Sequence, residues 1–171
     1  MAKLGDIVAR IIVRDLRALR RELDAYPDEE SVWAVPPGIA NSAGTLGLHL
    51  VGNINHFIGA QLGRTGYVRN RDAEFATRGT SRAELGSSID ATIAMVEATL
   101  PALTEEQWAE PFPIEAGGAR VRTDDFVIHL AVHLGYHLGQ VDYHRRLTAA
   151  PGTVGTMAIP ELATATRASS P

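Results

Sequence analysis

Two histidines four residues apart, His133 and His137, lie in a stretch without charged side chains, residues 126–141. At about 100° per residue, an α-helix places both imidazoles on one face. A buried imidazole needs a hydrogen-bond partner or a metal ion. Because a pair at this spacing can bind one ion from a single helix face, the pattern predicts a metal site.

A second charge-free segment, residues 45–63, offers a third ligand, because His49, Asn53 and His56 fall within a narrow sector of the expected helix. One histidine facing the first pair would give a three-histidine site with open positions for water or substrate. His49 and His56 are about 10 Å apart along the helix axis, so only one can join that ion. The alternative is that all are core or interface histidines held by hydrogen bonds; the pair plus a third histidine favours ligation.

Other polar residues share these helix faces. His129 and His144 are too far along the axis to reach the same ion, so we expect them to be supporting, capping or surface groups. Gln140, one turn beyond the pair, can orient a ligand or a bound water, or can form an ordinary interhelical hydrogen bond. With Tyr136 and Asn53 it is a candidate catalytic residue, and no general base is evident in the sequence.

Composition and motifs exclude several classes of protein. The residue after His133 is Leu134, so the general base of an HExxH metalloprotease is missing. The chain has no cysteine, which excludes disulfides, a cysteine nucleophile and thiolate-ligated zinc. A net charge of -4 argues against nucleic acid or an anionic membrane as the partner. No run reaches the roughly 18 apolar residues of a membrane span, and we expect a cytoplasmic protein.

Apolar periodicity and capping signals predict one all-α domain, a four-helix bundle over residues 1–150. The expected N-caps are Asn41 or Ser42 for the second helix, the Ser81 capping box for the third and Thr123 for the fourth. The helices are expected over about 4–25, 42–63, 81–100 and 123–148, with a charged loop over 64–80, a short turn after the Thr104 capping box and a Gly-rich β-hairpin over 112–121.

The residues outside the bundle core suggest how the chain associates. The tail, residues 151–171, is rich in Ala, Thr, Ser, Pro and Gly, and we expect it to be loosely ordered or packed on a partner. The second and fourth helices are apolar beyond one face. A four-helix monomer cannot easily cover both, so we expect a homodimer.

The spacing His129-x3-His133-x3-His137-x-Gly139-Gln140, with a further histidine in the second helix, resembles the DinB/YfiT-like superfamily of metal-dependent proteins. Residues 48–75 are also similar to one uncharacterised branch, and the resemblance covers about residues 5–150. It implies a four-helix bundle with up-down-down-up connectivity, often dimeric. It also implies that the metal ligands are His49, His133 and His137.

The resemblance also implies a kind of activity, because characterised members of the superfamily are thiol-dependent transferases and isomerases that use zinc or a similar ion. Neutral imidazoles accept several divalent ions, of which Zn and Ni are our first expectations. Arg69 and Arg71 could bind a carboxylate of a low-molecular-weight thiol, or could pair in solvent with Asp72 and Glu74. We therefore expect an enzyme that transfers such a thiol to a small-molecule electrophile, or a related metal-assisted hydrolase. The alternative is a non-catalytic, dimeric metal- or ligand-binding stress-response protein.

Overall fold

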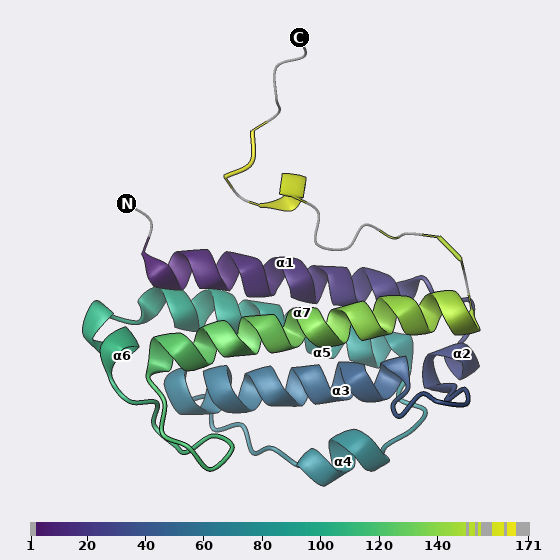
Figure 1. Ribbon diagram of the computed structural model, residues 1–171, viewed down its shortest axis with the longest axis horizontal. Coiled ribbons are helices and arrows are strands. Elements are labelled where there is room, and N and C mark those ends of the chain that lie inside the picture. The colour runs from purple at the N-terminus through teal and green to yellow at the C-terminus, as the bar shows by residue number, and fades with distance from the viewer. Residues whose placement is uncertain (1–2, 150, 153, 155–158, 163, 167–171) are drawn as a thin grey trace.

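Four long helices form a bundle in the computed structural model, as the helical patterns predict, and they have the up-down-down-up connectivity that the resemblance implies (Figure 1). The structure describes residues 3–149, 151–152, 154, 159–162 and 164–166. The long elements are α1 (Leu4–Asp24), α3 (Ala43–Ile54) with its continuation η1 (Asn55–Leu62), α5 (Arg82–Thr99) and α7 (Thr123–Thr148). Helices α1 and α7 run in one direction, and α3 and α5 run in the other.

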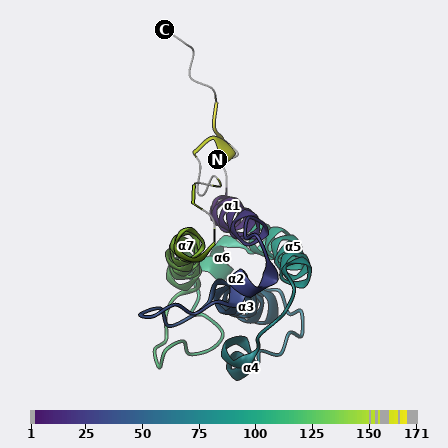
Figure 2. The same ribbon diagram turned by 90° about the vertical axis from the view of Figure 1, so that its right-hand side faces the viewer.

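The core lies between all four long helices. Seen from its end, the bundle has α1 between α5 and α7, with α3 diagonally opposite α1 (Figure 2). Each helix contributes apolar side chains that are fully buried, among them Ile12, Leu50, Ile89 and Leu134. The burial of these side chains provides the main driving force that fixes the helix positions.

The parallel direction of α3 and α5 requires a connection as long as the bundle. Residues 63–81 make this connection, and they contain a short helix, α4 (Arg71–Ala76), which packs on the outer side of α3. The expectation of a plain loop over 64–80 was therefore wrong in this part. The Asn70 side chain accepts a hydrogen bond from the Ala73 backbone N–H at 3.0 Å and so starts α4. The long connection before α3 also contains a helix, α2 (Glu29–Trp33).

The second long helix changes its winding after Ile54. Residues Asn55–Leu62 form a π-helix, in which backbone bonds run from i to i+5. The Asn55 side-chain amide donates to the Val51 carbonyl at 2.9 Å and to Thr92 Oγ1 at 2.7 Å, which stabilises the junction. Because a π-helix holds more residues per turn, the α-helical stripe that aligns His56 with His49 ends before His56.

The predicted capping signals are confirmed at three helices. Ser42, Ser81 and Thr104 each accept a hydrogen bond from the backbone N–H three residues later. Thr104 begins α6 (Glu105–Ala109), which follows η2 (Leu100–Ala102). The assignment of Thr123 as the cap of α7 was wrong by one residue. Arg122 is the N-cap, and the Thr123 hydroxyl donates instead to the Glu110 carbonyl at 3.1 Å.

The β-hairpin expected over residues 112–121 does not form. Two isolated antiparallel bridges join Pro111 to Arg122 and Ala116 to Ala119, and no strand forms among the described residues. Gly117 and Gly118 both have positive φ angles, 59° and 78°, so the expected Gly-rich tip is a tight turn. The segment is thus a closed loop that lies against the start of α7.

Buried polar contacts tie α7 to the rest of the bundle. The Arg145 guanidinium donates to Glu22 at 2.6 Å, with both side chains fully buried. His144 is buried between the Tyr26 hydroxyl, 2.7 Å from Nδ1, and the Ala34 carbonyl, 2.8 Å from Nε2. His144 therefore holds the fold together and does not reach the other histidines.

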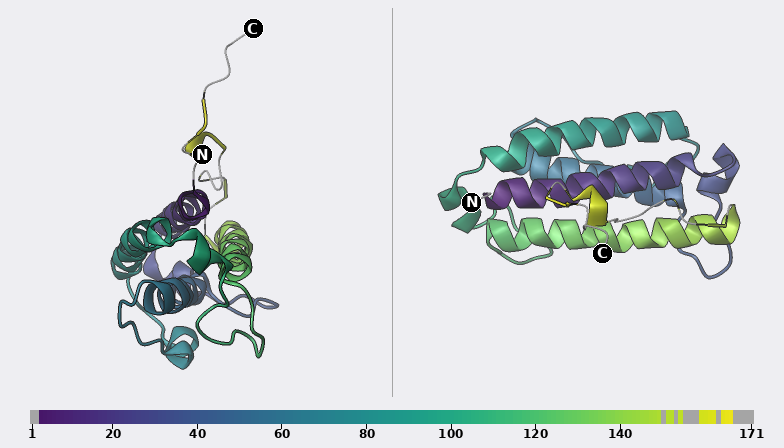
Figure 3. Two further views of the ribbon diagram at one scale, coloured as in Figure 1. Left: turned by 90° about the vertical axis from the view of Figure 1, so that its left-hand side faces the viewer. Right: turned by 90° about the horizontal axis from the view of Figure 1, so that it is seen from above.

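The described part of the tail lies on the α1 side of the bundle (Figure 3). Its short helix η3 (Ile159–Glu161) places the Glu161 carboxylate 3.0 Å from Arg21 of α1. Arg145 also donates to the Gly152 carbonyl at 2.9 Å. The rest of the segment expected to be a loose tail falls outside the described residues. None of the helices described here has the length and apolar character that crossing a membrane requires.

Candidate metal centre

Three imidazoles from two helices meet between α3 and α7, with the His49 side chain buried and the other two half-buried. His49 comes from α3, and His133 and His137 come from adjacent turns of α7. One ring nitrogen of each lies within 4.8 Å of the others. The Nε2 atoms of His133 and His137 are 3.1 Å apart, and the His49 ring centroid is 5.3 Å from each of their centroids. The structure thus brings together the three residues that the sequence predicts as ligands.

The His49 ring is held from behind by an ion pair. Its Nδ1 is 3.1 Å from Glu74 Oε2, and Arg69 binds the same carboxylate through Nε at 2.7 Å and Nη2 at 2.8 Å. A carboxylate accepts hydrogen bonds, so Nδ1 carries the proton and donates it. The lone pair of His49 is therefore on Nε2, which is the geometry of a metal-binding histidine with a carboxylate partner.

A glycine makes room for this carboxylate. Gly52 is one turn after His49 on α3, and a Cβ atom built there would lie 2.1 Å from Glu74 Oε1. Atoms at that distance overlap, so any side chain at this position would move Glu74. Gly52 is therefore the residue that lets α4 approach α3 closely enough for Glu74 to reach His49.

A second hydrogen bond fixes the ring of His137. Its Nδ1 is 2.6 Å from Gln140 Oε1, one turn along α7, so Nδ1–H donates and the lone pair is on Nε2. The lone pairs of His49 and His137 thus both belong to Nε2 atoms in a cluster that also contains His133 Nε2. The lone pairs of neutral nitrogens that converge need a proton or a cation between them. Imidazole nitrogens are ligands that suit Zn or another divalent transition metal.

The surroundings favour the neutral form of two of these imidazoles, His133 and His49. Burial, reinforced by the neighbouring His137 and His49 rings, lowers the pKa of His133 to about 4. Burial also lowers the pKa of His49, although Glu74 opposes that shift. Only a neutral imidazole can ligate a metal, so the environment favours the form that binds.

The other predicted candidates occupy different places. His56 lies outside the cluster, and its Nδ1 is buried without a hydrogen-bond partner in the described structure. His129 is exposed and stacks on Phe126 at 6.1 Å between centroids. Tyr136 is exposed, with its ring 5.2 Å from that of His137.

The two arginines expected to bind a carboxylate differ in their surroundings. Arg69 is nearly buried and donates to both oxygens of Glu74, and its Nη2 is also 3.3 Å from His49 Nδ1. The Arg71 guanidinium lies 5.0 Å from the ring centroid of Phe75, and Phe75 in turn packs 5.0 Å from the His49 ring. The supporting role of Glu74 was not anticipated, because this residue was expected to pair in solvent. The sequence signal for this contact is Gly52, three residues after His49, because a glycine within a helix indicates the close approach of another segment.

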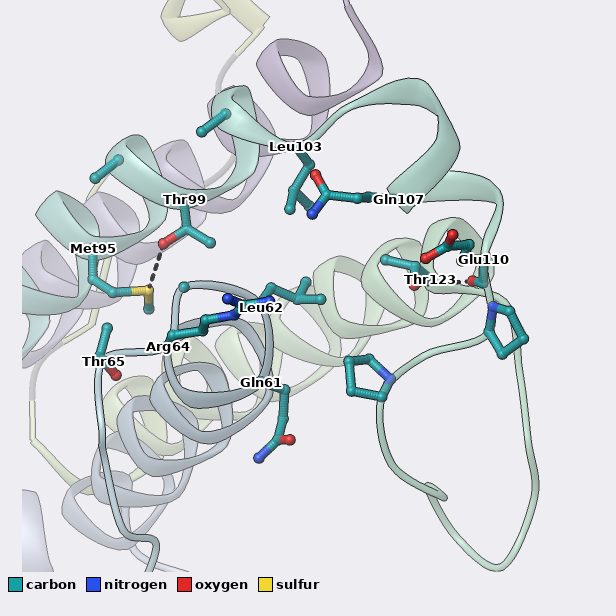
Figure 4. Close-up of a pocket in the computed structure, with 15 residues that line it drawn as sticks. Gln61, Leu62, Arg64, Thr65, Met95, Thr99, Leu103, Gln107, Glu110 and Thr123 are labelled. Atoms are coloured by element: carbon teal, nitrogen blue, oxygen red, sulfur yellow. Dashed lines mark hydrogen bonds between the residues drawn. The ribbon is translucent and has the colours of Figure 1, made fainter.

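A large cavity of the described structure is remote from the cluster. It has a volume of about 690 Å³ and lies where η1, α5 and α6 end, with Arg64, Thr99 and Gln107 among its lining residues (Figure 4). The α7 residue that lines it, Thr123, is ten residues before His133, or roughly 15 Å along the helix. A smaller cavity of about 440 Å³ adjoins the cluster directly and is lined by Asn53 and His133.

A four-helix bundle with three histidines converging from its second and fourth long helices is a scaffold for a metal site between those helices. The family model described as the DinB superfamily matches residues 11–141, so the chain belongs to the DinB superfamily. The matched region contains all three histidines together with Glu74 and Gln140. No curated protein matches the chain.

The two histidines of the second long helix allow a test of which of them binds the metal. We expect His49→Ala to weaken zinc affinity at least tenfold, because it removes one of three converging nitrogens. His56→Ala should change the affinity much less, because the His56 ring lies outside the cluster. A competitive chelator titration of both variants measures the difference. Loss of metal in His56→Ala with retention in His49→Ala would contradict this assignment.

The fit between Gly52 and Glu74 gives a test that leaves every proposed ligand in place. In Gly52→Ala, the new methyl group should displace Glu74 from His49 and lower zinc affinity about tenfold. Gly47→Ala is the matched control on the same helix, because a Cβ there meets Leu23 at an ordinary 3.4 Å. Calorimetric zinc titration compares the two variants. Equal affinities would show that the Glu74 contact does not support the site.

Proposed function

We propose that His49, His133 and His137 bind one divalent metal ion, Zn or Ni, and that the protein is an enzyme that uses it to transfer a low-molecular-weight thiol to an electrophile. The observation that carries the proposal is the convergence of three imidazoles of which two are fixed with Nε2 free, by Glu74 and by Gln140. A site built only for packing does not need this arrangement of lone pairs.

The chemistry follows from the charges. When bound, a divalent ion lowers the pKa of a thiol or a water, which makes a nucleophile available at neutral pH. Three neutral imidazoles leave the full charge of the ion for this effect. In the transfer, a sulfur–carbon bond forms while the bond to the leaving group breaks, and the thiol proton passes to solvent. Because the chain has no cysteine, the thiol must come from a second molecule.

The residues around the cluster support thiol transfer better than hydrolysis. Hydrolysis commonly needs a carboxylate or a histidine as a general base beside the attacking water. The carboxylate that contacts the cluster, Glu74, is buried and already accepts hydrogen bonds from Arg69 and His49. The candidates Asn53, Tyr136 and Gln140 have neither a carboxylate nor an imidazole, so their proposed roles are to orient substrate and ligands.

Of the two arginines proposed for a carboxylate of the thiol, Arg71 is better placed. It belongs to no ion pair among the described residues, and it lies over Phe75, whose other neighbour is His49. Arg69 could serve only by releasing Glu74, which would free the His49 ring. We therefore propose Arg71 as the carboxylate contact and Arg69 as the residue that positions Glu74.

Cobalt substitution tests thiol binding separately from turnover. We expect glutathione or cysteine to give a sulfur-to-cobalt absorption band with the Co²⁺-loaded protein, and expect the zinc form to conjugate the same thiol to 1-chloro-2,4-dinitrobenzene. His133→Ala should abolish both signals because it removes a ligand. A band without conjugation would favour the alternative, a non-catalytic metal- and ligand-binding protein. Absence of the band with every thiol tried would contradict thiol transfer.

An apolar stripe on α7 supports the proposal that the protein is a homodimer. Ile128, Val132, Tyr136, Tyr143 and Leu147 are exposed on this helix at spacings of four, four, seven and four residues. Exposed apolar side chains gathered on one helix face mark interaction surfaces. The outer side of α3, the other helix on which the expectation rested, is covered by α4. A second copy meeting α7 with its own α7 would bury the stripe on both chains at once.

Light scattering at micromolar concentration tests the dimer. We expect a mass of twice the 18.3 kDa of one chain. Val132→Glu places a charge within the stripe and should shift the mass toward that of one chain, whereas Val68→Glu, at an exposed site on the loop before α4, should leave the dimer intact. A wild-type mass near that of one chain would refute the proposal.

A further inference from the structure

A cavity of about 440 Å³ opens on the side of His133 that faces away from His137. Its volume falls within the range of small-molecule sites. Residues of α3 and η1 form one wall, the loop at Ala116–Val121 forms a second, and the first three turns of α7 form a third. His133 thus lies between the candidate metal centre and this cavity.

Two buried polar atoms of the cavity lining lack partners. Asn53 is only 8% exposed, and its Oδ1 has no hydrogen-bond partner among the described residues. The Nδ1 atom of His133 is likewise buried and unpartnered. Buried polar groups are normally hydrogen-bonded, because an unmade bond costs the desolvation of the group. A ligand with a hydrogen-bond donor would satisfy Asn53 Oδ1.

The rest of the lining is aromatic and apolar. Phe57 and Phe126 meet edge to face at 4.9 Å between centroids, and His129 stacks on the other side of Phe126. Val121 and Leu130 complete the apolar walls. Such walls favour a planar ring as the ligand body.

The charges of the lining exclude one class of ligand. Asp125 is the one carboxylate of its lining among the described residues, and no lysine or arginine lines the cavity there. The guanidinium of Arg69 lies 5.8 Å from the ring centroid of Phe57, but it donates to Glu74. In the metal-free protein, a carboxylate or phosphate placed in this cavity would therefore meet Asp125 with no lysine or arginine of the lining to balance it.

We infer that this cavity binds the electrophilic co-substrate, and that the co-substrate is a neutral, planar, apolar molecule with an O–H or N–H group that donates to Asn53 Oδ1. The role as co-substrate rests on the proposed function, whereas the binding itself does not. Asn53 determines specificity for the donor group, and the aromatic walls determine specificity for the ring.

Three probes with one ring system test the inference: 2-naphthol, naphthalene and 2-naphthoate. Fluorescence titration uses the full chain after treatment with chelator, so that no metal attracts the anion. We expect 2-naphthol to bind at least tenfold more tightly than 2-naphthoate. Asn53→Leu should weaken 2-naphthol about five- to tenfold, the factor typical of one uncharged hydrogen bond, and should leave naphthalene nearly unchanged.

Two further variants test whether the probes bind in this cavity and whether the effect of Asn53→Leu is specific. Gln61→Leu makes the same kind of amide-to-leucine change in the large remote cavity and should not alter binding of 2-naphthol. Val121→Trp fills the adjoining cavity from the loop and should abolish binding of 2-naphthol and naphthalene, even if Asn53→Leu does not fold. Equal affinity for 2-naphthoate, no binding of 2-naphthol, or binding that survives Val121→Trp or a folded Asn53→Leu would each overturn the inference. Zinc affinity is measured separately from the binding of these probes. Failure of the cavity inference is therefore distinguishable from failure of the metal site.

Discussion

A neutral imidazole has one lone pair, on the nitrogen opposite its N–H, so the partner at Nδ1 decides where that lone pair points. This constraint governs the centre of the molecule. Glu74 fixes His49, and Gln140 fixes His137, in each case with Nε2 left free. The convergence of the three rings has chemical meaning only because these two hydrogen bonds set the orientation.

The topology of the bundle brings Glu74 to its place. Since α3 and α5 run in the same direction, the chain must return along the bundle between them, and α4 lies on that return path. The path crosses the outer side of α3 where Gly52 leaves space for a carboxylate. An antiparallel pair joined by a short turn would have no segment at this position. The parallel direction of α3 and α5 is therefore what places Glu74 beside His49.

The Arg69–Glu74 pair also limits the chemistry of the site. A carboxylate that accepts a hydrogen bond from a buried guanidinium at each oxygen is held in one geometry. It can orient an imidazole, but it is poorly suited to accept a proton from a substrate. The cluster therefore has rigid support, and the carboxylate that contacts it is already engaged, which agrees with a nucleophile that an ion activates directly.

Periodicity and capping residues predicted the four long helices, because the apolar stripes and the Ser42 and Ser81 caps are local signals. The same helical spacing predicted that His133 and His137 share a face, and the family resemblance chose His49 over His56. The physical reason for that choice is that His49 lies opposite His133 and His137 and is held by Glu74 of α4. No local pattern in the sequence reveals such a contact.

The remaining differences have the same origin. Helix α4 has six residues and is stabilised by packing on α3, so a short charged segment gave no sign of it. The predicted hairpin failed because the segment pairs at only two isolated bridges. The role of Glu74 required knowledge of which chain segment crosses His49, which is a property of the tertiary fold.

The most direct test of the metal centre is the metal content of protein purified without a histidine tag, measured by inductively coupled plasma mass spectrometry. Wild-type protein should carry about one divalent ion per chain after incubation with Zn or Ni, and His133→Ala and His137→Ala should carry almost none while keeping their helical circular dichroism. Wild-type protein that remains free of metal after this incubation, or variants that keep a full complement, would contradict a metal site formed by these histidines.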